Sequence, residues 1–517
     1  MSRVNSTIKN VIFSYIAVIP STILNIITRY FFIRYLSVEY LGASGLFTSI
    51  FAILSFADLG IGEAITFKLY KPLAEKDHLK VSQLMHFYKL FYQVLTIFVF
   101  VTGLCFITFL PKLTNNSTLD NLVLIYILYL INTALGYFNA DKKSFLIANQ
   151  QSWVNNIIQN TFLCIQYVLQ LIVIVVTRNF LIYLLIQLLC QFLTGLYVAF
   201  YLRKHNTTIN YKNNMEPLGK DEKKSLFKNS GALFIHKIGD LVFNNITSVF
   251  ISANLGLLVM GYYSNYLMII NMVIVLLSYL TMPTQASIGN LCASIKDTNY
   301  LELVLKRMEF LLYFIYSTVS VLLLSCFSLI IKIYAGKEYF GFSLILLLVA
   351  NFMVTGMKII ISQFKTVSGL FTKDVFRPIA EASIYLVVGT VFIRVFGIEG
   401  LILAFMSIRL FSNTLIERML VYKHLLHKPV LKSYVEVIIK ILLTLTIGSL
   451  FSFLLNNLYI LNNLITLILK ASLTLFLYLV IFLLLYYKNQ YFKYWLNVAK
   501  EQVQSLFIKL TNGGNHE

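Results

Sequence analysis

Long apolar runs separated by short polar gaps recur along the entire chain. An α-helix needs about 20 mostly apolar residues to cross the hydrocarbon core of a bilayer. By that measure the pattern predicts fourteen spans, and therefore an all-α polytopic membrane protein. The predicted spans cover about residues 9–35, 40–66, 82–110, 119–139, 150–177, 179–202, 226–252, 256–283, 304–333, 341–368, 376–396, 399–418, 432–455 and 461–487.

The gaps between these spans alternate in charge. If the N-terminus lies in the cytoplasm, the segments expected inside contain 28 Lys and Arg residues and those expected outside contain 6. Cytoplasmic loops of membrane proteins are enriched in Lys and Arg, so this asymmetry predicts that both termini are cytoplasmic. It also favours an even number of spans, because one missed helix would scramble the alternation.

The longest inside gap, Arg203 to Ser225, separates a first set of six predicted helices from a second set of six plus two. The turn after the first helix leads to Gly42, and the turn after the seventh leads to Gly261, which favours a parallel internal repeat. We therefore expect two six-helix lobes, an extra C-terminal helix pair and a cytoplasmic tail. Their predicted boundaries are 1–212, 213–430, 431–487 and 488–517.

The tail, residues 488–517, repeats apolar side chains at helical spacing, with lysines elsewhere around the helix. Such an amphipathic helix lies on the anionic cytoplasmic leaflet in one interpretation. In the other, it packs against the protein itself. The sequence leaves both interpretations open.

Composition supports the membrane assignment. Hydrophobic residues make up 58% of the 517 residues, the mean hydropathy is +0.77 and 12% of the residues are charged. The net charge of +20 is explained better by topology than by nucleic acid, since no nucleic-acid-binding motif accompanies it. The five cysteines lie in apolar segments, and no soluble-enzyme motif or clustered metal ligands occur. We expect no catalytic residue, metal or cofactor, with an ion gradient or the membrane potential as a candidate energy source.

Eight basic residues remain inside the predicted spans. A charge at the centre of a membrane helix costs at least about 2.5–3.5 kcal/mol, so each needs a polar environment. Lys89 and Lys365 lie close enough to the cytoplasmic surface to snorkel. Four others are better candidates for a polar interior. They are Arg29 in the outer third of the first helix, Lys237 about 16 Å into the seventh, Lys358 in the inner half of the tenth and Arg409 near the middle of the twelfth.

Three carboxylates are the candidates for lining a cavity or coupling transport to ions. Asp58 and Glu63 fall in the inner half of the second predicted helix, and Asp240 follows Lys237 by three residues. Residues three apart on a helix are neighbours. Lys237 and Asp240 therefore either neutralise each other as a structural pair or line the transport site.

The second predicted helix and the loop after it carry the most specific motif. The segments Phe56-Ala57-Asp58-Leu59-Gly60-Ile61-Gly62-Glu63-Ala64-Ile65 and Lys68-Leu69-Tyr70-Lys71-Pro72-Leu73-Ala74-Glu75-Lys76-Asp77 resemble the signature of Wzx-type polysaccharide flippases. These flippases belong to the multidrug/oligosaccharidyl-lipid/polysaccharide (MOP) exporter superfamily. The similarity in topology extends over the whole chain.

This resemblance implies a V-shaped transporter that moves lipid-linked oligosaccharide repeat units to the outer leaflet of a bacterial plasma membrane by alternating access. It implies undecaprenyl-pyrophosphate as the carrier, bound in a cationic central cavity. Arg29, Lys237, Arg409 and Lys358 would then bind pyrophosphate, since Arg and Lys suit phosphate oxygens. Membrane lipids, a polysaccharide polymerase and glycosyltransferases of the same pathway are the expected partners, and nucleic acid is not.

Three alternatives remain. A flippase for lipid II or for a teichoic-acid-type precursor would share most of these features. A multidrug exporter of the same superfamily would favour acidic cavities, whereas the intramembrane charge here is basic. A membrane polysaccharide polymerase would need a sizeable extracytoplasmic loop, and the longest outside gap is about ten residues.

Overall fold

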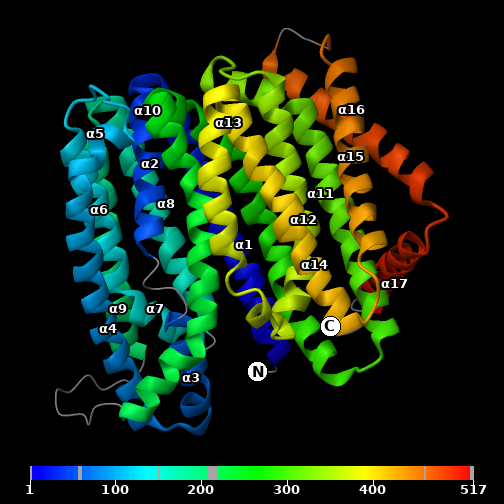
Figure 1. Ribbon diagram of the computed structural model, residues 1–517, viewed down its shortest axis with the longest axis horizontal. Coiled ribbons are helices and arrows are strands. Elements are labelled where there is room, and N and C mark those ends of the chain that lie inside the picture. The colour runs from blue at the N-terminus through cyan, green and yellow to red at the C-terminus, as the bar shows by residue number, and fades with distance from the viewer. Residues whose placement is uncertain (1–2, 56–60, 150, 206–218, 459–461, 513–517) are drawn as a thin grey trace. The chain divides into compact units, whose positions relative to one another are not determined.

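The fold is described from a computed structural model, which covers residues 3–55, 61–149, 151–205, 219–458 and 462–512 (Figure 1). Within these ranges the regular structure is helical throughout, which confirms the all-α fold class. The α-helices are α1 Arg3–Tyr35, α2 Val38–Leu54, α3 Ile61–Glu75, α4 His78–Cys105, α5 Leu110–Leu113, α6 Leu122–Phe138, α7 Ala140–Ala148, α8 Ser152–Thr177, α9 Phe180–His205, α10 Lys220–Ser294, α11 Thr298–Ala335, α12 Phe342–Val367, α13 Arg377–Ile408, α14 Leu415–Val421, α15 Leu431–Leu454, α16 Asn463–Tyr486 and α17 Gln490–Asn512.

The helices account for the predicted spans once two breaks are recognised. Among the described residues, ten helical stretches are long and apolar enough to cross a membrane. Two of them are far longer than one crossing requires, and each is interrupted by a glycine: Gly256 (φ 86°) in α10 and Gly397 (φ 63°) in α13. Only glycine adopts such left-handed angles readily. The breaks fall between the predicted seventh and eighth spans and between the eleventh and twelfth, while α1 and α2 cover the first two.

The chain packs as two compact units. The first comprises Met1–Tyr279 and Asp374–Leu401, and the second comprises Leu280–Lys373 and Ile402–Glu517. The helices expected in the second lobe are thus shared between the two units. The boundaries predicted from the sequence at 212, 430 and 487 stay predictions.

In the first unit, α1 packs along α8, and α4, α6 and α9 pack in sequence beside them. Apolar side chains from these helices and from α2 contribute to two buried clusters, with Tyr88 and Met85 in one and Phe47 and Tyr126 in the other. Aromatic rings supply much of this packing, since Phe47 meets both Tyr126 and Tyr129 edge to face. Many outward-facing positions of the same helices are also apolar, as expected for surfaces that contact lipid.

Two glycines bring the backbones of α2 and α10 together within this unit. A Cβ atom added to Gly42 would lie 1.9 Å from the Leu257 carbonyl oxygen, and one added to Gly261 would lie 2.2 Å from that of Val38. The approach is reciprocal, each glycine facing the backbone of the other helix. Gly42 and Gly261 are the two positions that the sequence pairs as equivalent, so this geometry fits the predicted parallel repeat.

In the second unit, α11 is the central helix and packs against α12, α15 and α16. The first turns of α17 also dock on α11. The Trp495 indole Nε1 donates to the Arg307 carbonyl oxygen at 2.8 Å, and the Arg307 guanidinium lies 3.8 Å from the centre of the Tyr494 ring. These contacts favour packing against the protein for the start of the tail helix.

Candidate functional site

Arg29 on α1 is held by neutral side chains of α10. Its Nε donates to Asn265 Oδ1 at 3.2 Å, and its Nη2 donates to Ser264 Oγ at 2.6 Å. Asn265 is fully buried, and Arg29 itself is half-buried. Among the residues that the structure describes, no carboxylate pairs with Arg29. Its positive charge is therefore solvated by dipoles but not cancelled.

Arg409 and Lys358 meet a polar stripe in the second unit. Asn351, Thr355 and Lys358 lie four and three residues apart on α12 and so share one helix face. Arg409 Nη1 donates to Asn351 Oδ1 at 3.2 Å and to Thr355 Oγ1 at 2.9 Å. Lys358 Nζ donates to Asn413 Oδ1 at 2.9 Å. Neutral oxygens hold both cations in these contacts.

The segment that carries Arg409 is itself irregular. Residues Arg409–Thr414 form a π-helical stretch that follows α13 and precedes α14. Such wide turns inside membrane helices are rare and occur frequently at functional sites. The irregular backbone therefore presents Arg409 and Asn413 to the polar face of α12.

Other basic side chains are neutralised by carboxylates instead. Lys365 Nζ lies 2.9 Å from Glu417 Oε1, and the two side chains are 2% and 3% exposed. Snorkelling was therefore the wrong prediction for Lys365, because a buried carboxylate takes the place of the membrane surface. Arg418 is fully buried and contacts both oxygens of Glu309, at 2.7 and 3.3 Å. Such pairs are structural, since each charge is cancelled where it is buried.

Lys237 lies in the first part of the long helix α10, which runs from Lys220 to Ser294. It precedes Gly256 by about 28 Å at 1.5 Å per residue, close to the full thickness of about 30 Å of a hydrocarbon core. Gly239 packs on the first turn of α13, where an added Cβ would lie 2.4 Å from the Ile379 nitrogen. The helix begins well before Lys237, at Lys220, and the predicted midplane depth of Lys237 stays a prediction.

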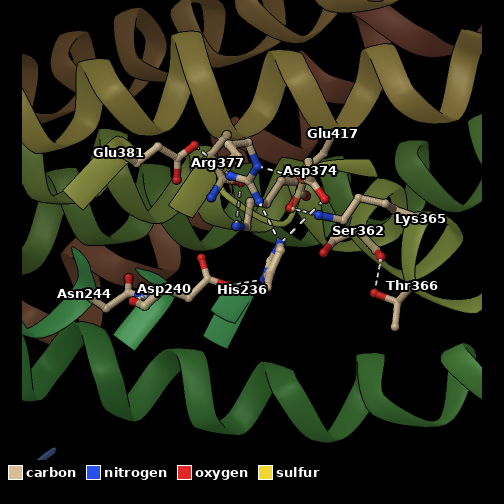
Figure 2. Close-up of polar contacts among 12 residues, drawn as sticks. His236, Asp240, Asn244, Ser362, Lys365, Thr366, Asp374, Arg377, Glu381 and Glu417 are labelled. Atoms are coloured by element: carbon tan, nitrogen blue, oxygen red, sulfur yellow. Dashed lines mark hydrogen bonds and ion pairs between the residues drawn. The ribbon is translucent and has the colours of Figure 1, made fainter. Parts of the chain in front are cut away.

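A second polar cluster surrounds this point, where α10 meets the start of α13 (Figure 2). Arg377 Nε donates to Asp374 Oδ2 at 2.8 Å, and Arg377 Nη1 donates to Glu381 Oε1 at 2.6 Å. His236 of α10 lies between Asp240, at 3.2 Å from Nδ1, and Asp374, at 3.8 Å from Nε2. Sequence reasoning named only Lys237 as a structural partner of Asp240 and missed His236, which lies one helical turn before Asp240.

The side chains of the other two predicted carboxylates, Asp58 and Glu63, are not among those that the structure describes. Asp58 lies outside the described residues, and Glu63 falls in α3 at a position whose side chain is not described. Their predicted roles stay predictions. Sequence reasoning also counted Arg377 and Arg418 among the loop charges, since both lie near the predicted inner ends of helices.

Comparison with known proteins identifies the family. The family described as polysaccharide biosynthesis protein matches residues 7–288, more than half of the chain. This chain belongs to the polysaccharide biosynthesis protein family. No curated protein sequence matches it.

Solved structures show the fold of this polysaccharide biosynthesis family member. An inward-facing multidrug resistance MATE family transporter of the MOP superfamily is similar at 15% identity and a TM-score of 0.63, over 79% of this chain and 97% of that one. Lipid II flippase MurJ, in an inward closed conformation, is similar at 16% identity and a TM-score of 0.61, over 91% of this chain and 99% of that one. The Vibrio cholerae MATE transporter VcmN in the bent form reaches 14% identity and a TM-score of 0.52, over 86% and 99%. The protein is thus a multi-pass membrane protein with a MOP-superfamily fold.

Proposed function

We propose that this protein is a flippase that moves undecaprenyl-pyrophosphate-linked oligosaccharide repeat units from the cytoplasmic to the outer leaflet of a bacterial plasma membrane, with both termini in the cytoplasm. Its family places it in polysaccharide biosynthesis. The observation that carries the proposal is the way in which its intramembrane cations are held. Arg29 carries the contrast: its guanidinium donates to an amide and a hydroxyl, and no carboxylate among the described residues pairs with it, whereas Lys365, Arg377 and Arg418 face carboxylates. Arg409 and Lys358 also donate to neutral oxygens.

This division has a physical meaning. An arginine in a membrane helix is costly unless an anion or strong dipoles compensate its charge. A carboxylate partner cancels the charge permanently, and a neutral partner keeps it available for a ligand. Arginine has five N–H donors, and the contacts of Arg29 with Asn265 and Ser264 use only two nitrogens of its fork. A pyrophosphate carries about two negative charges and accepts such bidentate donors.

The polar face of α12 suits the same ligand. Asn351 and Thr355 orient the Arg409 guanidinium, and Lys358 adds a second cation one turn further along. Arg recognises phosphate oxygens through a planar fork, while Lys acts as a compact point charge. In this proposal Arg29, Arg409, Lys358 and Lys237 bind the pyrophosphate, as the resemblance to Wzx-type flippases implies.

The rest of the substrate follows from its chemistry. An oligosaccharide is too polar for the hydrocarbon core, so it crosses along polar side chains of the protein. The polyprenyl tail is apolar and stays in lipid.

A flippase for lipid II is the second candidate, because its carrier presents the same pyrophosphate and the lipid II flippase MurJ shares the fold over 91% of this chain. The cation arrangement fits both substrates, which differ in their sugars. An exporter of organic cations is disfavoured, because such cargo needs carboxylates, whereas Arg29 brings a positive charge that neutral side chains hold.

The proposal is tested in cells by replacing single cations at matched protein level. Arg29→Ala and Arg409→Ala are expected to reduce surface polysaccharide strongly. Arg394→Ala is the matched control, since Arg394 is an exposed arginine of α13 whose loss removes the same charge. Unchanged surface polysaccharide in both cavity variants would contradict the pyrophosphate assignment.

A further inference from the structure

His236 occupies a position where its protonation state decides its partner. Its Nε2 lies 3.3 Å from Arg377 Nη2 and 3.8 Å from Asp374 Oδ1, and its Nδ1 lies 3.2 Å from Asp240 Oδ2. Figure 2 shows the ring directed from α10 toward Arg377 and Asp374. A donor and an acceptor thus compete for one ring nitrogen.

The neutral ring has one arrangement that satisfies both nitrogens. A guanidinium can only donate, so a hydrogen bond from Arg377 Nη2 requires Nε2 to accept. The proton of the neutral ring then resides on Nδ1, which donates to Asp240 Oδ2. A neutral His236 in this tautomer is linked to both Arg377 and Asp240.

Protonation reverses this preference. When water on the cytoplasmic side delivers a proton to Nε2, that nitrogen becomes a donor and can no longer accept from Arg377. The imidazolium also repels the guanidinium and is attracted by Asp374, which lies within about 4 Å. A shift of about 1 Å would bring Nε2 from 3.8 Å to hydrogen-bond distance of Asp374 Oδ1.

We propose that His236 on α10 is a proton-binding switch. When it binds a proton, its hydrogen-bond partner at the start of α13 changes from Arg377 to Asp374. The proposal deepens the function proposed above and rests on it, because it identifies the proton as the ion that biases the transport cycle. The exchange alters the polar contacts between α10 and α13, whose backbones already approach closely at Gly239. No bond other than N–H forms or breaks.

The surroundings of the ring suit a site that is reached by protons. The His236 side chain is 13% exposed, so water reaches its edge, and Asp374 is only 4% exposed, so its charge is poorly screened. The charged groups around the ring within this unit come from both elements. They are Lys237 and Asp240 on α10, and Asp374, Arg377 and Glu381 on the segment that begins α13.

The tautomer is measured first, on the wild-type protein in lipid nanodiscs. With ¹⁵N-labelled histidine, His236→Gln identifies the His236 signals by their loss. At pH 8.5 the ring is expected to carry its proton on Nδ1, opposite to the Nε2 preference of a free histidine side chain. A proton on Nε2 at that pH would overturn the proposal, and this result needs no further variant to fold.

The partner is tested by titration. Asp374→Asn is expected to move the midpoint of the His236 titration to lower pH by about 1 unit, since a nearby opposite charge shifts protonation by about 1–3 units. Asp297→Asn, the same change at an exposed acid that begins α11, should leave the midpoint unchanged. His78, an exposed histidine, serves as the internal reference. An unmoved midpoint in Asp374→Asn would refute the switch.

A translocation assay distinguishes failure of the His236 switch from failure of the proposed flippase function. In proteoliposomes, translocation by the wild type is expected to change several-fold between pH 5.5 and 8, and His236→Gln should show a flat profile. Equal pH dependence of the two proteins overturns the switch. Translocation of no lipid-linked oligosaccharide at any pH would contradict the flippase, while the tautomer and midpoint would still report on His236.

Discussion

The glycine contact between α2 and α10 gives a graded prediction. Gly42→Ala places a Cβ 1.9 Å from the Leu257 carbonyl oxygen. Real side-chain atoms approach a carbonyl no closer than about 3.3 Å, so the two helices must separate by more than 1 Å. Overpacking of this kind costs about 1–3 kcal/mol, which corresponds to about a 5- to 150-fold change in the equilibrium between the folded and the unfolded protein.

Two other glycines calibrate the effect. A Cβ on Gly45 would lie 2.7 Å from Met260 Cε, the flexible end of a side chain that can move aside. A Cβ on Gly136 of α6 would lie 3.6 Å from Gln191 Nε2, an ordinary contact. Since alanine stabilises a helix by about 1 kcal/mol relative to glycine, Gly136→Ala should be neutral or stabilising. The expected order of destabilisation is Gly42, then Gly45, then Gly136.

The assay is thermal unfolding of the three purified variants in one detergent. Unfolding is measured as the fraction of each protein that stays monodisperse after heating. Gly42→Ala should lower the midpoint temperature most, and Gly136→Ala should leave it unchanged or raise it. Equal midpoints for Gly42→Ala and Gly136→Ala would refute the reasoning, because they would show that no backbone contact exists at Gly42.

Two further predictions concern the second unit. Glu309→Gln leaves the Arg418 charge buried without its counter-charge and should destabilise the protein by about 3–5 kcal/mol, whereas the double variant Glu309→Leu/Arg418→Met should recover most of the loss in the same unfolding assay. Trp495→Phe removes the hydrogen bond to the Arg307 carbonyl oxygen, so proteolysis within α17 should become several-fold faster, and an unchanged cleavage rate would contradict docking of the tail on α11.

The helical architecture could be predicted from the sequence because lipid imposes a length and an apolar surface on each span. The breaks at Gly256 and Gly397 fall where turns are expected, since glycine adopts their backbone angles (φ 86°, ψ 170° and φ 63°, ψ −144°) at little cost. The extent of α10 was less predictable, because the helix already begins at Lys220, ahead of the apolar run, and hydropathy does not show where such a helix begins.

The candidate site could be predicted from the sequence only in part. The sequence could single out Arg29 and Arg409 as charges far from any loop, but their partners are distant along the chain: Asn265 follows Arg29 by 236 residues. The burial of Arg377 could not be foreseen either. It lies at a helix start, where a charge is usually solvated, and only the packing of α10 against α13 encloses it with Glu381.

The most direct test of the account is translocation by purified protein. Proteoliposomes carry labelled undecaprenyl-pyrophosphate oligosaccharide, and a membrane-impermeant reagent reports the fraction that crosses the bilayer. The wild type and the exposed-arginine control Arg394→Ala should translocate the lipid at the same rate. Arg29→Ala should be at least about tenfold slower, since a hydrogen bond to a charged group contributes about 1.5–3 kcal/mol. Equal rates for Arg29→Ala and Arg394→Ala would contradict the claim that the cations held by neutral groups bind the pyrophosphate.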